Sequence, residues 1–261
     1  MSDLSVSDIG SGIAGTVGSR IFFREAIDST NNLAVQLAVE GLPEGTAVIA
    51  DSQSRGRGRH GREWLSPPGV NIYFSILLRP DITPTSAFLI TFMSAVSCAS
   101  ALRKTTGQDI RIKWPNDLVF KDKKLGGILT ETKTSHDKIL FAVTGTGINV
   151  NMRANDFPDY LQDSSTSLLN ETGICYSRAP IIRDILNEMD IRYSILKSSG
   201  RDRILAEWKE LSSTLGRKVL VKTDTGQTEG LAEAIDDNGL LILRLATGQI
   251  EKVHSGIICP L

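Results

Sequence analysis

The sequence of 261 residues is poor in the residues that build disulfide frameworks and metal centres. Its three cysteines, Cys98, Cys175 and Cys259, are widely spaced and form no C-x-x-C pair. The three histidines are scattered as well, so neither a zinc site nor a disulfide scaffold is indicated. Buried thiols in a reducing compartment are the expected use of such cysteines, which predicts a cytoplasmic protein.

Long apolar runs and an excess of charge of one sign are also missing. The N-terminus is acidic and has no apolar core of a signal peptide, and no stretch approaches about 18 apolar residues, so we expect neither secretion nor a membrane span. The net charge of −1 gives no support for bulk binding of nucleic acid. The apolar content of 41% and the charged content of 23% are those of an ordinary globular protein.

Positive charge is nevertheless concentrated in one stretch, Gln53 to Trp64, which reads Q-S-R-G-R-G-R-H-G-R-E-W. Glycine lets backbone N–H groups approach a ligand closely, and the forked donors of arginine match carboxylate and phosphate oxygens. We therefore expect a flexible loop that closes over an anionic small molecule, with Trp64 offering a flat face to a base or ring. Residues 54–64 are called the arginine loop below.

Three other interpretations of this stretch remain open. G-x-G-x-x-G at residues 56–61 matches the dinucleotide fingerprint, but Pro67 and Pro68 argue against the helix that this fingerprint needs next. Arginine- and glycine-rich segments also bind nucleic acids, although such segments are usually repetitive and disordered. A run of charge can finally be a solvated loop without any role.

Apolar periodicity predicts an α+β domain, in which a mixed sheet carries helices on one side. The expected strands span residues 21–23, 46–50, 70–78, 110–114, 118–120, 125–130 and 139–143. The expected helices span residues 30–40, 85–104, 180–197 and 201–211. From Gly216 onward, short strands at 218–223, 228–235, 240–245 and 250–253 alternate with glycine turns, which is typical of a small β-barrel. We therefore expect a flexible lead-in over residues 1–20, a catalytic domain over 21–213 and a barrel over 214–261.

Four motifs and one preceding tetrapeptide carry a resemblance. They are the arginine loop, K-W-P-N-D-L at 113–118, K-L-G-G-I-L at 124–129, G-T-G-I-N at 145–149, and D-S-T-N at 28–31. Their order and spacing closely resemble the biotin–protein ligase family, from about Ile21 to the end of the chain. The resemblance implies a catalytic domain followed by an SH3-like barrel. Some bacterial members add a winged-helix domain and act as repressors, but only about 20 residues precede the catalytic domain here, so no repressor role is expected.

The chemistry of that family explains the residue types. Biotin and ATP, with Mg²⁺, give biotinyl-5′-AMP and pyrophosphate, and the biotinyl group then passes to a lysine of a biotin carboxyl carrier domain. Because the biotin carboxylate itself attacks the α-phosphorus, the protein needs no nucleophile of its own. It must hold two anions together and neutralise the charge that moves onto pyrophosphate, which calls for Arg, Lys and Mg²⁺. The Mg²⁺ is expected on the ATP phosphates, without a protein-only metal site.

The resemblance implies site residues motif by motif. The implied biotin-binding residues are Ser29, Thr30, Asn31, Gln53, Gly56, Arg57, Lys124 and Gly127. The implied ATP-binding residues are Arg59, Arg62, Trp64, Lys113, Asn116 and Asn149. The implied catalytic residues are Arg59, Lys113, Asp117 and Lys124.

Simpler structural roles stand beside several of these assignments. Ser29 or Thr30 is also the expected N-cap of the first helix, and the two roles are compatible. Asp117 would orient or deprotonate the incoming lysine amine, or only cap a turn. Trp64 could serve packing alone, and Trp114 is expected in the core.

Two other functions, acylation with lipoate or octanoate and nucleic-acid binding, remain as alternatives, and the oligomeric state is open. A lipoate or octanoate ligase or transferase also acylates carrier lysines, but K-W-P-N-D and the arginine loop favour biotin. A transferase with a thioester intermediate would also want a cysteine in a motif, and the motifs contain none. A nucleic-acid-binding module with an SH3-like barrel is disfavoured by the neutral net charge. A monomer and a homodimer formed through an exposed sheet edge are both compatible with the sequence.

Overall fold

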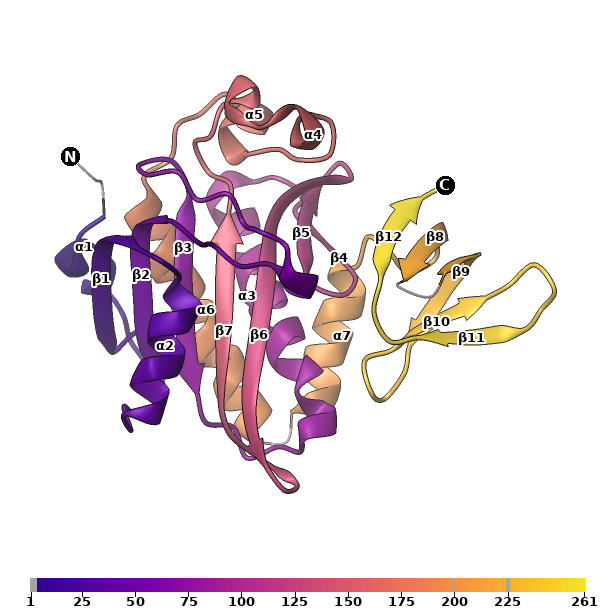
Figure 1. Cartoon of the computed structure of the whole chain (residues 1–261), viewed down its shortest axis with the longest axis horizontal. Helices are drawn as coiled ribbons and strands as arrows, with labels where there is room; N and C mark the ends of the chain where they lie inside the picture. Colours follow the sequence, from indigo (N-terminus) through magenta and orange to yellow (C-terminus); the bar gives the residue numbers. More distant parts are fainter. Residues whose placement is uncertain (1–3, 199, 224–225) are drawn as a thin grey trace.

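The computed structural model describes residues 4–198, 200–223 and 226–261. A seven-stranded sheet, in the order β1-β2-β3-β7-β6-β5-β4, is followed along the chain by a separate five-stranded sheet (Figure 1). The strands of the large sheet are β1 (Arg20–Ile27), β2 (Thr46–Gln53), β3 (Ile72–Leu78), β4 (Arg111–Lys113), β5 (Asp117–Phe120), β6 (Lys123–Ser135) and β7 (Lys138–Ile148). Strand β1 runs parallel to β2, and the other neighbours are antiparallel, which confirms the expected mixed sheet.

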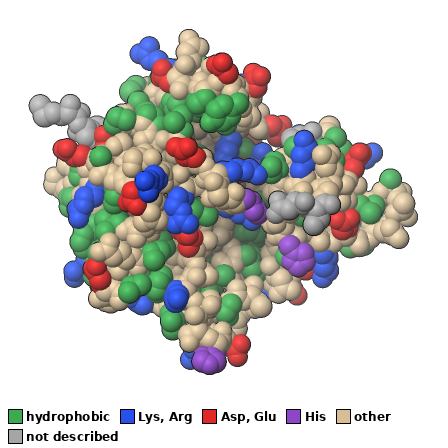
Figure 2. Space-filling model, in the orientation of Figure 1, with side chains coloured by type: hydrophobic (Ala, Val, Ile, Leu, Met, Phe, Trp, Pro, Cys, Tyr) green, Lys and Arg blue, Asp and Glu red, His purple; other side chains and the backbone are tan. Residues whose placement is uncertain are grey.

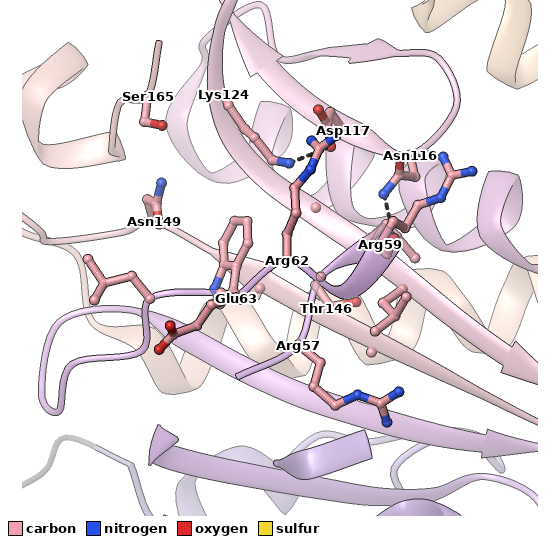
Figure 3. Close-up of a pocket in the computed structure, with 18 of the residues that line it drawn as sticks. Arg57, Arg59, Arg62, Glu63, Asn116, Asp117, Lys124, Thr146, Asn149 and Ser165 are labelled. Carbon is pink, nitrogen blue, oxygen red and sulfur yellow. Dashed lines mark hydrogen bonds and ion pairs between the residues drawn. The ribbon is translucent and has the colours of Figure 1, made fainter. Parts of the chain in front are cut away.

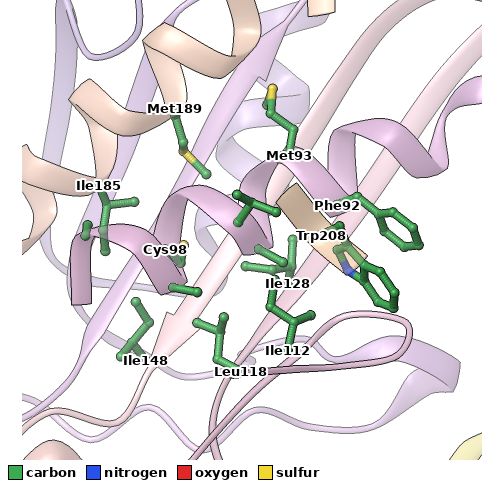
Figure 4. Close-up of a cluster of buried hydrophobic side chains, with 14 of the residues drawn as sticks. Phe92, Met93, Cys98, Ile112, Leu118, Ile128, Ile148, Ile185, Met189 and Trp208 are labelled. Atoms are coloured by element: carbon green, nitrogen blue, oxygen red, sulfur yellow. The ribbon is translucent and has the colours of Figure 1, made fainter. Parts of the chain in front are cut away.

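Three long helices cover one face of this sheet. They are α3 (Phe88–Thr106), α6 (Arg178–Lys197) and α7 (Arg201–Leu211), and they lie behind the strands in Figure 1. Their apolar stripes form the main core with the strands, and within it the rings of Phe92 and Trp208 stack with centroids 4.4 Å apart (Figure 4). Burying two such large rings is a major favourable term in folding.

The apolar character of α3 is explained by its place in the core. Together with the preceding turn η2 (Pro84–Ser86), the segment Pro84–Thr106 is long and apolar enough to cross a membrane by length and composition alone, contrary to the expectation that no stretch of the sequence is. Most of α3 is buried against the sheet and its neighbouring helices. Its buried hydroxyls are satisfied within the helix, since Ser94 Oγ donates to Ile90 O and Ser97 Oγ donates to Met93 O.

The short helix α2 (Thr30–Val39) corrects the expectation that all helices lie on one side. It packs on the opposite face, where a second apolar cluster joins Ala34 and Leu37 to Val48, Leu77 and Val143. Successive side chains of a strand point to opposite faces, so a continuous apolar run such as residues 47–50 supplies both clusters. The sequence shows that run, but not which helix covers which face.

The hairpin formed by β6 and β7 is longer than the sequence predicts. Strand β6 continues beyond Thr130 to Ser135, and β7 continues beyond Val143 to Ile148. The end of β6 is polar and exposed, so apolar periodicity could not show it. The G-T-G-I-N motif therefore begins inside β7 rather than after it.

The N-terminal segment is another correction. Residues 4–19 are not a loose lead-in, because they contain α1 (Val6–Gly10), in which Ile9 is fully buried. Ser5 caps this helix by accepting a hydrogen bond from Asp8 N at 3.0 Å, and Val17 N donates to Asp190 Oδ1 at 2.9 Å on α6. A few apolar side chains within a Ser- and Gly-rich composition are enough to dock the segment. Residues 1–3 lie outside the described part.

Four short helical segments complete the large domain. They are η1 (Arg59–Gly61), η3 (Ala154–Asp156), α4 (Asp159–Gln162) and α5 (Leu168–Thr172). The helices α4 and α5 lie at one end of the sheet, above the end of β7 in Figure 1.

The C-terminal module is an antiparallel sheet in the order β11-β10-β9-β8-β12, consistent with an SH3-like barrel. Its strands are β8 (Lys218–Thr223), β9 (Gly226–Ile235), β10 (Leu241–Arg244), β11 (Ile250–Val253) and β12 (Ile257–Pro260). The last strand was not predicted, because four residues ending in proline carry little strand signal. Trp114 connects this module to the large sheet, since its Nε1 donates to Gly239 O at 3.1 Å. Trp114 is 2% exposed, which confirms its expected place in the core.

Candidate active site

One cavity of about 340 Å³ brings the sequence motifs together. It lies between the arginine loop, the ends of β2 and β7, the β4–β5 turn and the start of β12, and Lys and Arg side chains gather around this hollow in Figure 2. Of the site residues predicted from the sequence, all except Gly56 line it. Gly56 lies directly behind, where a Cβ atom would come within 2.2 Å of Trp64 O. The volume suits a ligand of small-molecule size.

One end of the cavity is polar and uncharged. Gln53 Oε1, at the end of β2, accepts from the backbone N of Thr30 at 2.9 Å and from its Oγ1 at 3.2 Å. Ser29 occupies the N-cap position of α2, but its side chain makes no capping bond. Gln53 thus accepts the hydrogen bond of a backbone N–H at the N-terminus of α2. The hydroxyl of the buried Ser29 makes no capping bond there.

The arginine loop is a hydrogen-bonded ribbon rather than an irregular loop. Trp64 N donates to Gly56 O at 2.9 Å, and Gly58 N donates to Arg62 O at 2.7 Å. Between these bonds the chain reverses through η1, where His60 and Gly61 have φ of 56° and 69°. The ribbon brings Arg57, Arg59 and Arg62 to the lining of the cavity.

The arginines of the loop have different surroundings. Arg57 pairs with Glu131 on β6 at 2.7 Å, whereas Arg59 Nη1 donates to Asn116 Oδ1 at 3.1 Å. Burial lowers the pKa of Arg59, Asp117 opposes this effect, and the like charge of Arg62 adds to it. A partly desolvated guanidinium beside a second one is a place where an incoming anion gains energy.

Trp64 lies across the glycines of β6 and β7. A Cβ atom at Gly147 would come within 2.4 Å of the Trp64 indole, so only glycine leaves room for this ring. Gly145 has the same role for Asn31, whose Oδ1 would lie 2.0 Å from an added Cβ. The expectation that the chain passes close to something at G-T-G-I-N is thereby confirmed. Lys124 Nζ lies 5.5 Å from the Trp64 ring centroid, within cation–π range.

Lys124 and Asp117 form an ion pair at the centre of the cavity. Lys124 Nζ lies 2.7 Å from Asp117 Oδ1, and both side chains are partly exposed to the cavity (Figure 3). Asp117 begins β5 and pairs in register with Lys113 at the end of β4. The Asp117 carboxylate thus contacts an ammonium that lines the cavity, and its role in the reaction stays a prediction.

Two asparagines that line the cavity are held in fixed orientations. Asn116 Nδ2 donates to Ile128 O at 2.7 Å, which turns its Oδ1 toward Arg59. Asn149 Nδ2 donates to Thr166 O at 3.0 Å, and Asn149 is 6% exposed. Fixed amides of this kind present defined donors or acceptors to a ligand.

Several lining residues were not found from the sequence. Ser164 and Ser165 form a wall because Lys124 N donates to Ser164 O at 2.8 Å, and residues 256–258 reach the cavity from the C-terminal module. Glu131, on β6, is not itself a lining residue, but it pairs with the lining residue Arg57. No local motif marks these positions, since each is brought to the site by contacts between segments far apart in the chain.

Comparison with known proteins agrees with this geometry. The model of the biotin/lipoate A/B protein ligase family matches residues 23–149, and that of the biotin protein ligase C-terminal domain matches residues 214–259. The bifunctional ligase/repressor BirA of Bacillus subtilis is 37% identical, over 98% of this chain and 78% of that protein. The biotin--[acetyl-CoA-carboxylase] ligase of Paracoccus denitrificans is 33% identical, over 85% of this chain and 93% of that protein.

The solved structure of the biotin protein ligase from Aquifex aeolicus in complex with biotin and ATP superposes with a TM-score of 0.77. It is 29% identical, and the match covers 92% of this chain and 97% of that chain. Fold and cavity define a ligase of the biotin/lipoate type. The chain belongs to the biotin protein ligase family.

Proposed function

We propose that this protein is an ATP-dependent biotin–protein ligase. It joins biotin to AMP and then transfers the biotinyl group to a lysine of a biotin carboxyl carrier domain. The observation that carries the proposal is one cavity with a polar uncharged end, a central Lys–Asp pair, and a cationic end that holds a tryptophan. The relatives named as biotin ligases support it, as does the structural neighbour in complex with biotin and ATP.

The polar end suits the ureido ring of biotin. Such a ring carries amide donors and a carbonyl acceptor without net charge, and buried neutral side chains recognise these groups best. Ser29, Thr30 and Gln53 offer hydroxyl and amide groups there, and Asn31 and Gly127 border the same space. The ribbon around Gly56 and Arg57 covers it with backbone groups.

The cationic end suits the nucleotide. Arg59, Arg62 and Lys113 contact the phosphates in this proposal, and Trp64 stacks on adenine with Asn116 and Asn149 beside it. In the first step a biotin carboxylate oxygen attacks the α-phosphorus and pyrophosphate leaves, so cations are needed where charge accumulates. We propose that Mg²⁺ binds through the ATP phosphates, as it commonly does in enzymes that use ATP.

The ion pair at the centre suits the second step. Lys124 exchanges Asp117 for the biotin carboxylate and later the acyl phosphate. Asp117 is then free to receive the acceptor lysine. The amine nitrogen attacks the acyl carbon, the bond to AMP breaks, and the amine loses one proton, which a nearby carboxylate helps to remove.

The acceptor follows from the chemistry and from the relatives. We propose the carrier domain of a biotin-dependent carboxylase, in keeping with the name of the Paracoccus relative. We also propose a cytoplasmic location, because Cys98, Cys175 and Cys259 are all free thiols.

A transfer assay tests the proposal. The protein is incubated with biotin, MgATP and an unbiotinylated carrier domain, and the carrier is analysed by intact mass. We expect one added biotinyl group, none on a carrier whose target lysine is replaced by arginine, and none without ATP. Transfer of lipoate or octanoate instead of biotin would contradict the proposal.

A further inference from the structure

Glu131 makes contacts that the proposed reaction does not use. Its carboxylate, on β6, accepts hydrogen bonds from Arg57 Nη2 at 2.7 Å and Nη1 at 3.1 Å. The same carboxylate accepts a third bond, 2.8 Å long, from Asn31 Nδ2. One side chain therefore joins the start of the arginine loop to the first turn of α2. Guanidinium–carboxylate pairs with two parallel bonds are the strong members of their class.

The other end of the loop is tied to the same cavity wall. Trp64 O accepts from Ser66 Oγ at 2.9 Å, and Ser66 Oγ accepts from Gln53 Nε2 at 3.0 Å. Gln53 in turn accepts from Thr30. The end of the loop is thus connected to the side chains that face the biotin end.

Ser75, on β3, closes the connection. Its Oγ lies 2.8 Å from Thr30 Oγ1 and 2.6 Å from Asn31 Oδ1, and the residue is fully buried. A continuous series of hydrogen bonds thus begins at one end of the arginine loop, passes beneath the cavity and returns to the other end. We call it the loop–pocket network; its members are Trp64, Ser66, Gln53, Thr30, Ser75, Asn31, Glu131 and Arg57.

We propose that Glu131 is a positioning residue of this network. Its negative charge keeps Asn31 with Nδ2 toward β6 and Oδ1 toward Ser75, and it keeps Arg57 drawn down so that the loop backbone lies over the biotin end. Glu131 thereby favours this conformation of the loop, which reduces the ordering cost of binding. This inference rests on the proposed function, since it assigns the covered end to biotin.

The ion pair between Arg57 and Glu131 also affects the repulsion among the arginines of the loop. Four arginines within eight residues would repel one another and keep the loop open until an anion arrives. Glu131 already pairs with Arg57, so Arg57 adds less to the repulsion among the other three arginines of the loop. The two halves of the loop thus differ. The half with Arg57 is bound to Glu131, and the half with Arg59 and Arg62 is the one proposed to contact the phosphates.

The substitution Glu131→Gln tests the proposal. Glutamine offers one acceptor oxygen, and its amide would face either Arg57 or Asn31 with a donor, so one contact is lost and the charge is removed. We expect the KM for biotin to rise about tenfold, the scale for losing a charge-assisted bond, while kcat at saturating substrates stays within about twofold. Without ligands, trypsin should cleave the arginine loop several-fold faster.

Two further variants separate positioning from general effects. Glu233→Gln is the matched control, because Glu233 accepts paired bonds from Arg244 at 2.8 and 2.9 Å in the C-terminal module, away from the cavity. It should change neither the KM for biotin nor cleavage in the loop. Arg57→Ala leaves the Asn31 contact intact, so it should increase cleavage at the remaining arginines with a smaller change in KM.

Failure of the role proposed for Glu131 and failure of the proposed function give different results. Glu131→Gln with the Tm, biotin KM and cleavage rate of the wild type would overturn the proposal. A loss of kcat at unchanged KM would also overturn it, because the residue would then act in the reaction. If the wild type has no biotin-dependent turnover, the proposed function fails, and the cleavage rates without ligand still decide whether Glu131 holds the loop.

Discussion

Replacing Gly147 by alanine perturbs the nucleotide end of the cavity without touching a charged group. The added Cβ would lie 2.4 Å from Trp64 Cε2 and Nε1, whereas ordinary contacts begin at 3.4 Å. The indole must therefore move by about 1 Å, or the strand that carries Gly147 must shift. A ring displaced in this way no longer stacks on adenine in the proposed geometry.

The magnitude follows from the strength of stacking. Stacking of a base on an aromatic side chain contributes about 1–3 kcal/mol, which corresponds to about 5- to 150-fold in affinity. We therefore expect Gly147→Ala to raise the KM for ATP within that range and to change the KM for biotin much less. The assay is pyrophosphate exchange with ATP varied at saturating biotin, and with biotin varied at saturating ATP.

Two control variants accompany Gly147→Ala. Gly10→Ala introduces a methyl group at an ordinary 3.9 Å contact and should leave both constants unchanged. Adding Trp64→Phe to Gly147→Ala should restore part of the ATP affinity, because the smaller ring leaves space for the methyl group. A folded Gly147→Ala protein with the wild-type KM for ATP would refute the role of Trp64.

Three more predictions concern the site and the stability of the fold. Lys113→Ala should reduce biotin adenylation about a hundredfold or more, the scale of one lost transition-state charge contact, as measured by pyrophosphate exchange; near-wild-type turnover would remove Lys113 from the site. The arginine loop should be cleaved more slowly by trypsin when biotin and ATP are bound, because an anion neutralises its free arginines; equal rates in both states would count against closure. Burial raises the pKa of Glu44, but hydrogen bonds from Tyr193 and Lys197 outweigh this effect and leave it lowered. Its stabilising contribution is therefore present above its ordinary pKa of 4.5 and lost as pH falls through the lower folded value. Urea unfolding should show that Glu44→Gln loses less stability than the wild type below about pH 4.5, and equal losses would contradict the assignment.

The sequence predicted the elements whose signal is local. Helix α7 was predicted with its observed bounds, because Ile204, Leu205 and Trp208 recur on one side and are buried. The extension of β6 and the strand β12 were missed, because their residues are polar or few and are held by pairing with distant strands. Helix α1 was missed for a related reason, since Ile9 becomes informative only when it docks.

In the site, too, residues with a local sequence signal were predicted, and residues placed by distant contacts were not. The motif residues converge on one cavity as the sequence suggested, because each motif lies at the end or turn of a strand in one sheet. Glu131 could not be found in this way, since it lies beyond the motif on a polar strand and acquires its role through Arg57 and Asn31. The proposed chemical roles themselves stay predictions until they are measured.

The most direct test of the central claim is exchange of labelled pyrophosphate into ATP, with Mg²⁺ present and biotin, octanoate and lipoate supplied in parallel. We predict exchange with biotin alone, because adenylation of the biotin carboxylate is reversible while the adenylate stays in the cavity. Exchange with octanoate or lipoate instead would assign the polar end of the cavity to another acid. No exchange with any of the three acids, from a folded protein, would contradict the assignment of the arginine loop to ATP.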